Sequence, residues 1–174
     1  MKNSRMRFIV GLMAAFMVLP LTATQHRFPE VLSIRDRAAT VDAITAMRLE
    51  HILPQAMRQA EIDMWIMPSR EDNYDPVFLT MIPYDAWCPI TQILVFYDPG
   101  EGKEIERLNI SRTDMKGLHK KAWDSRAWDL EKKESQWDCL RRIVLERDPR
   151  RIGINVGEVQ WAAGGLTVVL KKKL

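Results

Sequence analysis

The residues of this chain that are best able to do chemistry are three histidines, two cysteines and one short acidic stretch. His26, His51 and His119 are far apart in the sequence, and none of them lies in an HExxH motif or beside a second metal-ligating residue. A zinc site needs three or four ligands of the His, Cys or carboxylate type. The histidines therefore predict no zinc centre.

The acidic stretch "REDNYDP" contains Asp72, Asn73 and Asp75. A calcium-binding loop would place oxygen ligands at alternate positions and then a glycine, but Tyr74 stands where the second ligand belongs. Asp and Asn before a proline are ordinary turn residues. We therefore predict a turn here and set calcium binding aside.

The two cysteines, Cys88 and Cys139, belong to no CxxC motif and to no signature of a nucleophile. A disulfide between them and two separate buried thiols are both open, and we favour the separate thiols. Gly153 and Gly157 follow a predicted strand, but neither GxGxxG nor GK[ST] is present. The sequence thus predicts no catalytic, cofactor-binding or metal-binding residue in this chain.

The N-terminus has the composition of an export signal. Lys2, Arg5 and Arg7 precede an apolar run over residues 8–21. That run is shorter than the roughly 18–20 residues that span a bilayer, and its length is typical of a signal peptide. We predict a signal peptide over residues 1–23 and a periplasmic or secreted protein. A retained N-terminal anchor is the alternative, and only then would the chain contact a membrane.

Charge argues against a nucleic-acid partner. The leader holds three of the 26 basic residues and none of the 23 acidic ones, so the rest of the chain is balanced. Trp123 and Trp128 lie in a basic stretch and could stack on single-stranded bases, but acidic residues are interleaved with them. We predict instead a loop whose tryptophans pack on the domain or on a neighbour; exposed tryptophans would mark a protein interface.

The elements that would position these residues follow from periodicity. We expect a helix from about Asp42, with Pro54 causing a kink or standing in the first turn of a second helix. A buried strand over 62–69, an irregular stretch over 70–90 and a hairpin around residues 99–102 come next. A helix over 135–147 precedes a strand over 151–155 and a further helix. This order predicts an α/β fold, a mixed β-sheet flanked by helices.

Several blocks, taken in order, resemble the N-terminal domain of the creatinase, prolidase and Xaa-Pro aminopeptidase family, particularly its secreted, aminopeptidase P-like bacterial members. The matching stretches are "AEIDMWIMPSREDNYDPVFLT", "ILVFYD", "IERLNISR", "GLHKKAWD" and "ERDPRRIGINVGEVQWAAGGLT". We expect a signal peptide at 1–23, an approach segment at 24–40 and the creatinase N-terminal-like domain at 41–174.

The resemblance implies a non-catalytic domain that helps to oligomerise the enzyme and shapes its substrate entrance. In the family, a following "pita-bread" domain holds two divalent metals, commonly manganese, which activate the water that attacks the peptide bond before proline. None of those ligands is assigned here, so the resemblance predicts a truncated or split form that is inactive alone. Its partner would be a second copy or a separate catalytic half, and proline-containing peptides would bind only if that half were supplied.

Two late positions depart from the family pattern. Asn-x-Ser-Glu appears as Asn155-Val156-Gly157-Glu158, and Ala-Asp-Gly-Leu-Thr appears as a segment with Gly164 and Gly165 in succession. The first change replaces a good helix N-cap by glycine, which costs a few tenths of a kcal/mol. The alternative hypothesis for the whole chain is a stand-alone periplasmic interaction or oligomerisation module.

Overall fold

The structure, a computed structural model, describes residues 31–124, 133–157 and 164–174. The chain divides into two units, residues 1–31 and residues 32–174. The predicted signal peptide, His26 and Trp128 lie outside the described residues, and all that follows concerns the second unit. Within the described part of the chain, no helix is long and apolar enough to cross a membrane.

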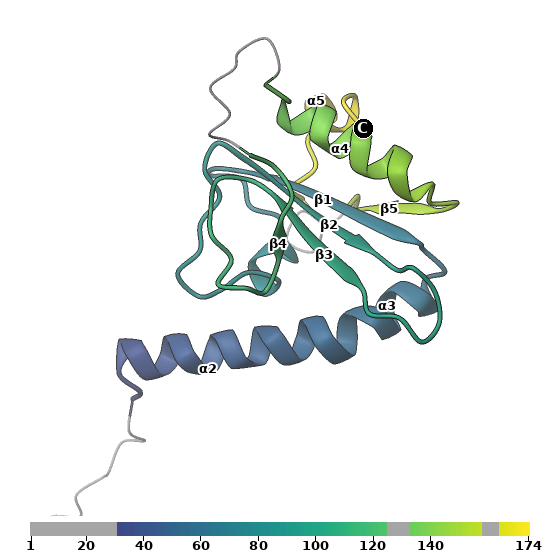
Figure 1. Cartoon of the computed structure of the whole chain (residues 1–174). Coiled ribbons are helices and arrows are strands. Elements are labelled where there is room, and N and C mark those ends of the chain that lie inside the picture. Colours follow the sequence, from purple (N-terminus) through teal and green to yellow (C-terminus); the bar gives the residue numbers. More distant parts are fainter. Residues whose placement is uncertain (1–30, 125–132, 158–163) are drawn as a thin grey trace, which may run out of the picture. The chain divides into compact units, whose positions relative to one another are not determined.

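The second unit is built on a mixed sheet, as the sequence predicted, and this sheet has five strands (Figure 1). Its order is β4-β3-β2-β1-β5, in which β1 pairs antiparallel with β2, β2 antiparallel with β3, and both outer pairs are parallel. The strands are β1 (Met64–Arg70), β2 (Thr91–Tyr97), β3 (Glu106–Ile110), β4 (Lys120–Lys121) and β5 (Ile152–Ile154). The predicted hairpin is β2 and β3, while β4 was not expected.

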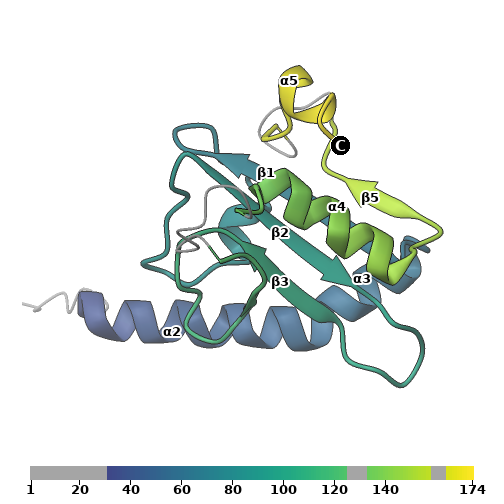
Figure 2. The ribbon, with the colours of Figure 1, turned by 45° about the horizontal axis from the view of Figure 1, so that its top comes forward.

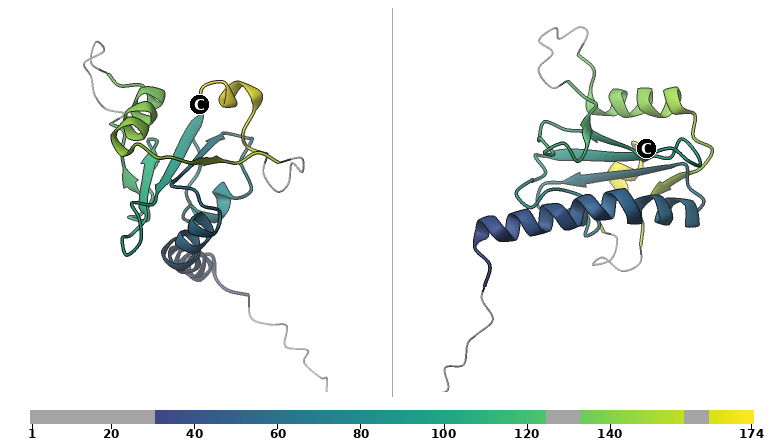
Figure 3. Two further views of the ribbon diagram at one scale, coloured as in Figure 1. Left: turned by 90° about the vertical axis from the view of Figure 1, so that its right-hand side faces the viewer. Right: turned by 60° about the horizontal axis from the view of Figure 1, so that its bottom comes forward.

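Helices cover both faces of this sheet. One face carries a continuous run of α2 (Ile34–Met47), the π-helical turn η1 (Arg48–Ile52) and α3 (Leu53–Gln59), and the other face carries α4 (Gln136–Arg147). Figure 2 looks onto the α4 face, and the two views of Figure 3 place the two helix layers on opposite sides of the strands. A 3₁₀ turn, η2 (Phe78–Thr80), and a short helix, α5 (Val168–Lys171), complete the unit.

The first helix begins at Ile34 and not near Asp42, so the expected approach segment is partly helical. Ser33 is the reason: its hydroxyl accepts the Asp36 backbone N–H at 3.2 Å, which is the usual chemistry of an N-cap. Of the two expectations for Pro54, the one that places it in the first turn of a second helix is confirmed. Pro54 stands in the first turn of α3, and the π-helical turn η1 leads into α3 without a break.

Strand alternation divides the core into two apolar clusters, one on each face of the sheet. On β2, Ile93 and Val95 belong to the cluster under α4, whereas Leu94 and Phe96 belong to the cluster under η1 and α3. Because successive side chains of a strand point to opposite faces, a strand that is apolar throughout has to be buried on both sides. All four of these side chains are fully buried.

The predicted helix over 135–147 is confirmed as α4. Ser135 caps it by accepting the Asp138 N–H at 3.1 Å, and Asp148 ends it in a left-handed conformation with φ of 44°. Leu140 and Ile143 are buried against the sheet. At the C-terminal end of α4, a hydrogen bond joins the helix to β2: the Tyr97 hydroxyl donates to the Arg147 carbonyl at 3.2 Å.

Candidate interaction surface

Within the residues that the structure describes, the histidines and cysteines that could do chemistry do not form a common site. His51 is exposed on η1, whereas His119 is 6% exposed and packs against the Phe96 ring at 5.7 Å between centroids. The Nε2 atom of His119 lies 2.7 Å from the Met81 carbonyl oxygen and Nδ1 has no partner. Burial lowers the pKa of His119 to about 4. Among the described residues, no group of three or more His, Cys, Asp or Glu side chains is placed to hold a metal ion.

The two cysteines are separate buried thiols, which is the interpretation that we favoured. Cys88 belongs to the cluster under η1 and α3, and Cys139 to the cluster under α4, so the sheet lies between them. Burial raises the pKa of each thiol to about 11. Since the thiolate is the reactive form, neither sulfur is prepared for nucleophilic attack at neutral pH.

The tryptophan stretch packs inward where it is described. Trp123 is 8% exposed, and its indole N–H donates to the Glu134 carbonyl oxygen at 2.7 Å. The prediction that these tryptophans pack on the domain is confirmed for Trp123. Trp123 therefore supplies no exposed interface, and an interaction surface has to be sought elsewhere.

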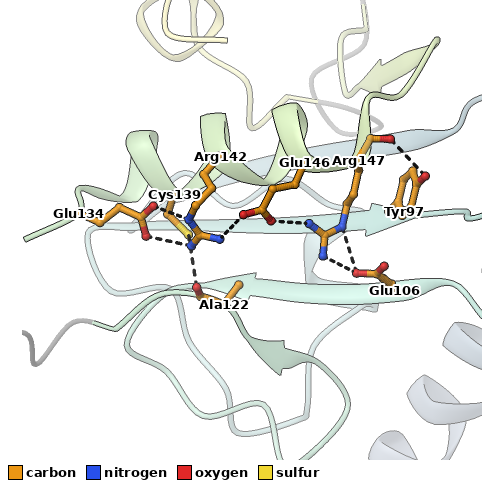
Figure 4. Close-up of polar contacts among 8 residues, drawn as sticks. All are labelled: Tyr97, Glu106, Ala122, Glu134, Cys139, Arg142, Glu146 and Arg147. Carbon is orange, nitrogen blue, oxygen red and sulfur yellow. Dashed lines mark hydrogen bonds and ion pairs between the residues drawn. The ribbon is translucent and has the colours of Figure 1, made fainter.

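A ladder of charges along α4 ties this helix to the sheet (Figure 4). Arg142 pairs with Glu134 at 2.7 Å, and Arg147 pairs with Glu106 of β3 at 2.6 Å. Glu146 lies between the two arginines and pairs with both. The Arg142 guanidinium holds the pKa of Glu134 below its usual range. Each of these charges has an opposite partner, and the Arg147–Glu106 pair joins α4 to the sheet, although partly exposed pairs of this kind add little stability.

Residues 74–90, which belong to the stretch over 70–90 that the sequence predicted as irregular, are held by a buried carboxylate. Asp75 is 1% exposed and its Oδ1 accepts the Val77 N–H at 2.8 Å, which confirms the predicted turn. The same oxygen accepts the Asn155 amide at 2.9 Å, and Oδ2 accepts the Gly165 N–H at 3.4 Å. Two segments 80 and 90 residues away thus bind one side chain. We call residues 74–90 the pinned loop.

Further contacts fix the backbone of the pinned loop along its length. Each joins a main-chain atom of the loop to a side chain from another part of the fold. The pairs are Thr80 O with Arg48, Met81 O with His119, Tyr84 N with Asp42, and Trp87 O with Thr113. Lys116 adds ion pairs to Asp85 of the loop at 2.7 Å and to Asp42 of α2 at 3.1 Å. The Lys116 ammonium lowers the pKa of Asp85.

The pinned loop nevertheless turns large apolar side chains to solvent. Phe78, Met81, Ile82 and Cys88 are buried and anchor it. Its exposed large side chains are Tyr74, Leu79, Tyr84, Trp87 and Ile90, and the last two are 55% and 67% exposed. Ile90 also has φ of 50°, a left-handed conformation that is strained for a β-branched residue. A rigid backbone that presents tryptophan and tyrosine has the composition of a protein-binding surface.

Sequence reasoning missed the pinned loop as a site, although its aromatic residues were visible between prolines. What marks the loop as a site is the solvent exposure of these side chains, and apolar periodicity cannot predict exposure in an irregular segment. Comparisons of the chain with protein-family models, with curated proteins and with solved structures return no match.

Proposed function

We propose that this chain is a non-catalytic domain of the Xaa-Pro aminopeptidase type, exported from the cytoplasm, whose own task is to join protein chains through the pinned loop. The observation that carries this proposal is the combination of a fixed backbone and exposed apolar side chains over residues 74–90. The partner is a second copy of the chain, because the resemblance implies a domain that oligomerises its enzyme.

Preorganisation is the physical reason for choosing this segment. Ordering a flexible loop at an interface costs conformational entropy, which reduces the affinity. Here the side chains of Asp75, Asp42 and Thr113 already hold the loop. The conformational entropy of the loop is therefore lost when the chain folds, and not when two chains associate. Desolvating Trp87 and Ile90 would then contribute almost fully to binding.

The mixed sheet between two helix layers supports the proposal, since the same architecture is expected of the family's N-terminal domain. The buried groups that could have served a reaction have structural partners. Asp75 holds the pinned loop, and His119 donates to it through Met81. In the family the bond before proline is cut by a separate two-metal domain, and the proposal gives this chain no share of that step.

The test of association is sedimentation equilibrium of the purified chain over a range of concentrations. The wild type should self-associate, and Trp87→Lys should weaken the dimer roughly tenfold or more, since a buried charge replaces an aromatic anchor. Val169→Lys is the matched control, because Val169 is 62% exposed on α5 and outside the loop. A wild type that remains monomeric at about 100 μM would contradict the proposal.

The non-catalytic part has its own assay. The purified chain with manganese is incubated with Gly-Pro and Arg-Pro peptides, and release of the first residue is followed. We expect no release above that of peptide and manganese alone. Metal-dependent turnover that co-purifies with the chain would show that it is an enzyme, whatever its oligomeric state.

A further inference from the structure

The two edges of the sheet differ in their chemistry. At one edge, β4 consists of Lys120 and Lys121, both exposed, and lysines on an edge strand discourage pairing with another chain. At the other edge, β5 has the sequence Ile152-Gly153-Ile154 and pairs with β1 alone among the described strands (Figure 2). The β5 edge therefore has no charged side chain of its own to exclude a further strand.

An apolar groove of about 610 Å³ lies between β5 and α4. Ile152 and Ile154 both line it, since residues two apart on a strand share a face. The helix supplies the opposite wall through Trp137, Val144 and Leu145. Ile152 is 44% exposed and Leu145 is 70% exposed, so this apolar surface is open to solvent. The volume lies within the range of pockets that bind small ligands and peptide side chains.

The rim of this groove is positively charged. Of the charged side chains that line it, Arg141 and Lys173 are basic and Asp138 is acidic. The Lys173 ammonium lies 5.2 Å from the centre of the Trp137 ring, which holds it over the apolar wall. A ligand with carboxylates on either side of its apolar residues would complement this rim.

We infer that β5 accepts an extended segment of another protein as an additional strand, with alternate apolar side chains in the groove and acidic residues beside Arg141 and Lys173. Addition of a strand satisfies main-chain groups, while alternate pockets select the side chains. Since β5 has only three residues, its main chain forms few hydrogen bonds, and burial of apolar surface supplies most of the affinity. This site is separate from the pinned loop and does not depend on self-association.

The test uses a fluorescein-labelled peptide of alternating valine and isoleucine, interrupted and flanked by glutamate, titrated with the purified full-length chain. We expect a Kd on the order of 10 μM. Leu145→Gln and Ile152→Gln, both at exposed positions, should each weaken binding roughly tenfold or more without changing the charge of the groove. Val169→Gln, which lies outside the groove, should bind like the wild type. Amide exchange should slow, when the peptide is bound, at those N–H groups of β5 that point away from β1.

Four results would overturn the inference. The first is equal binding of the peptide to the wild type and to both groove variants. The second is equal binding of a peptide with proline at alternate positions, which cannot pair as a strand. The third is a self-associated chain that Leu145→Gln dissociates, because a second copy would then occupy the groove. The last is binding to anionic lipid vesicles that Leu145→Gln abolishes while the peptide does not bind, since the groove would then face a membrane.

Discussion

Acidification should destabilise this protein through one imidazole. His119 is buried, and its Nε2–H donates to the Met81 carbonyl, which leaves Nδ1 as a lone pair without a donor. Protonation would place a charged N–H where no acceptor lies, close to the positive charge of Arg107. Burial therefore lowers the pKa of His119 from 6.5 to about 4.

The sign and size of the effect follow from this shift. Above a pH of about 6.5 the imidazole is neutral in the folded and unfolded chains, so it makes no difference. Between about 6.5 and 4 only the unfolded chain takes up the proton, and the free energy of unfolding falls with pH. The loss is about 2 kcal/mol at pH 5 and about 3 kcal/mol at pH 4, where it begins to level off.

Urea denaturation of the wild type and of His119→Gln at pH 7 and pH 5 measures this loss. Glutamine can still donate to the Met81 carbonyl but does not titrate. With an m-value near 2 kcal/mol/M, the wild-type midpoint should fall by about 1 M between the two pH values, and that of the variant by much less. His51→Gln, at an exposed histidine, is the control for loss of an imidazole. Equal falls in wild type and His119→Gln would refute the reasoning.

Two further predictions concern the pinned loop. Gly165→Ala should lower the free energy of unfolding by about 1–3 kcal/mol. The added Cβ would lie 2.5 Å from the Cβ of Asp75 and 2.8 Å from the Asp75 backbone. A thermal melt like that of the wild type would contradict this contact. Ile90→Asn should stabilise the chain by about 1 kcal/mol, since Asn tolerates positive φ, and should weaken self-association, since the apolar side chain is lost. A melt with lower stability, or unchanged sedimentation, would count against the assigned role of Ile90.

The sequence alone determined those elements that depend on near neighbours. Short apolar runs bounded by turn residues located β1, β2 and β3, and the spacing of apolar residues such as Leu140 located α4. The place of Pro54 in the first turn of α3 follows from the missing N–H of proline. The start of α2 at Ile34 could also have been predicted from the sequence, because the Ser33 cap is a local feature. It was missed because the first turns of α2 have no apolar stripe, and apolar periodicity was the signal used to locate helices.

Only the tertiary structure decided which side chains share a site. Asp75 meets Asn155 and Gly165 across 80 and 90 residues, and no local pattern encodes a contact of that range. The same limit holds for β4, whose two lysines become a strand only because β3 lies beside them. Exposure of Trp87 and Ile90 follows from what the fold places around them, which is why a segment that looked featureless in the sequence became the surface to which we assign function.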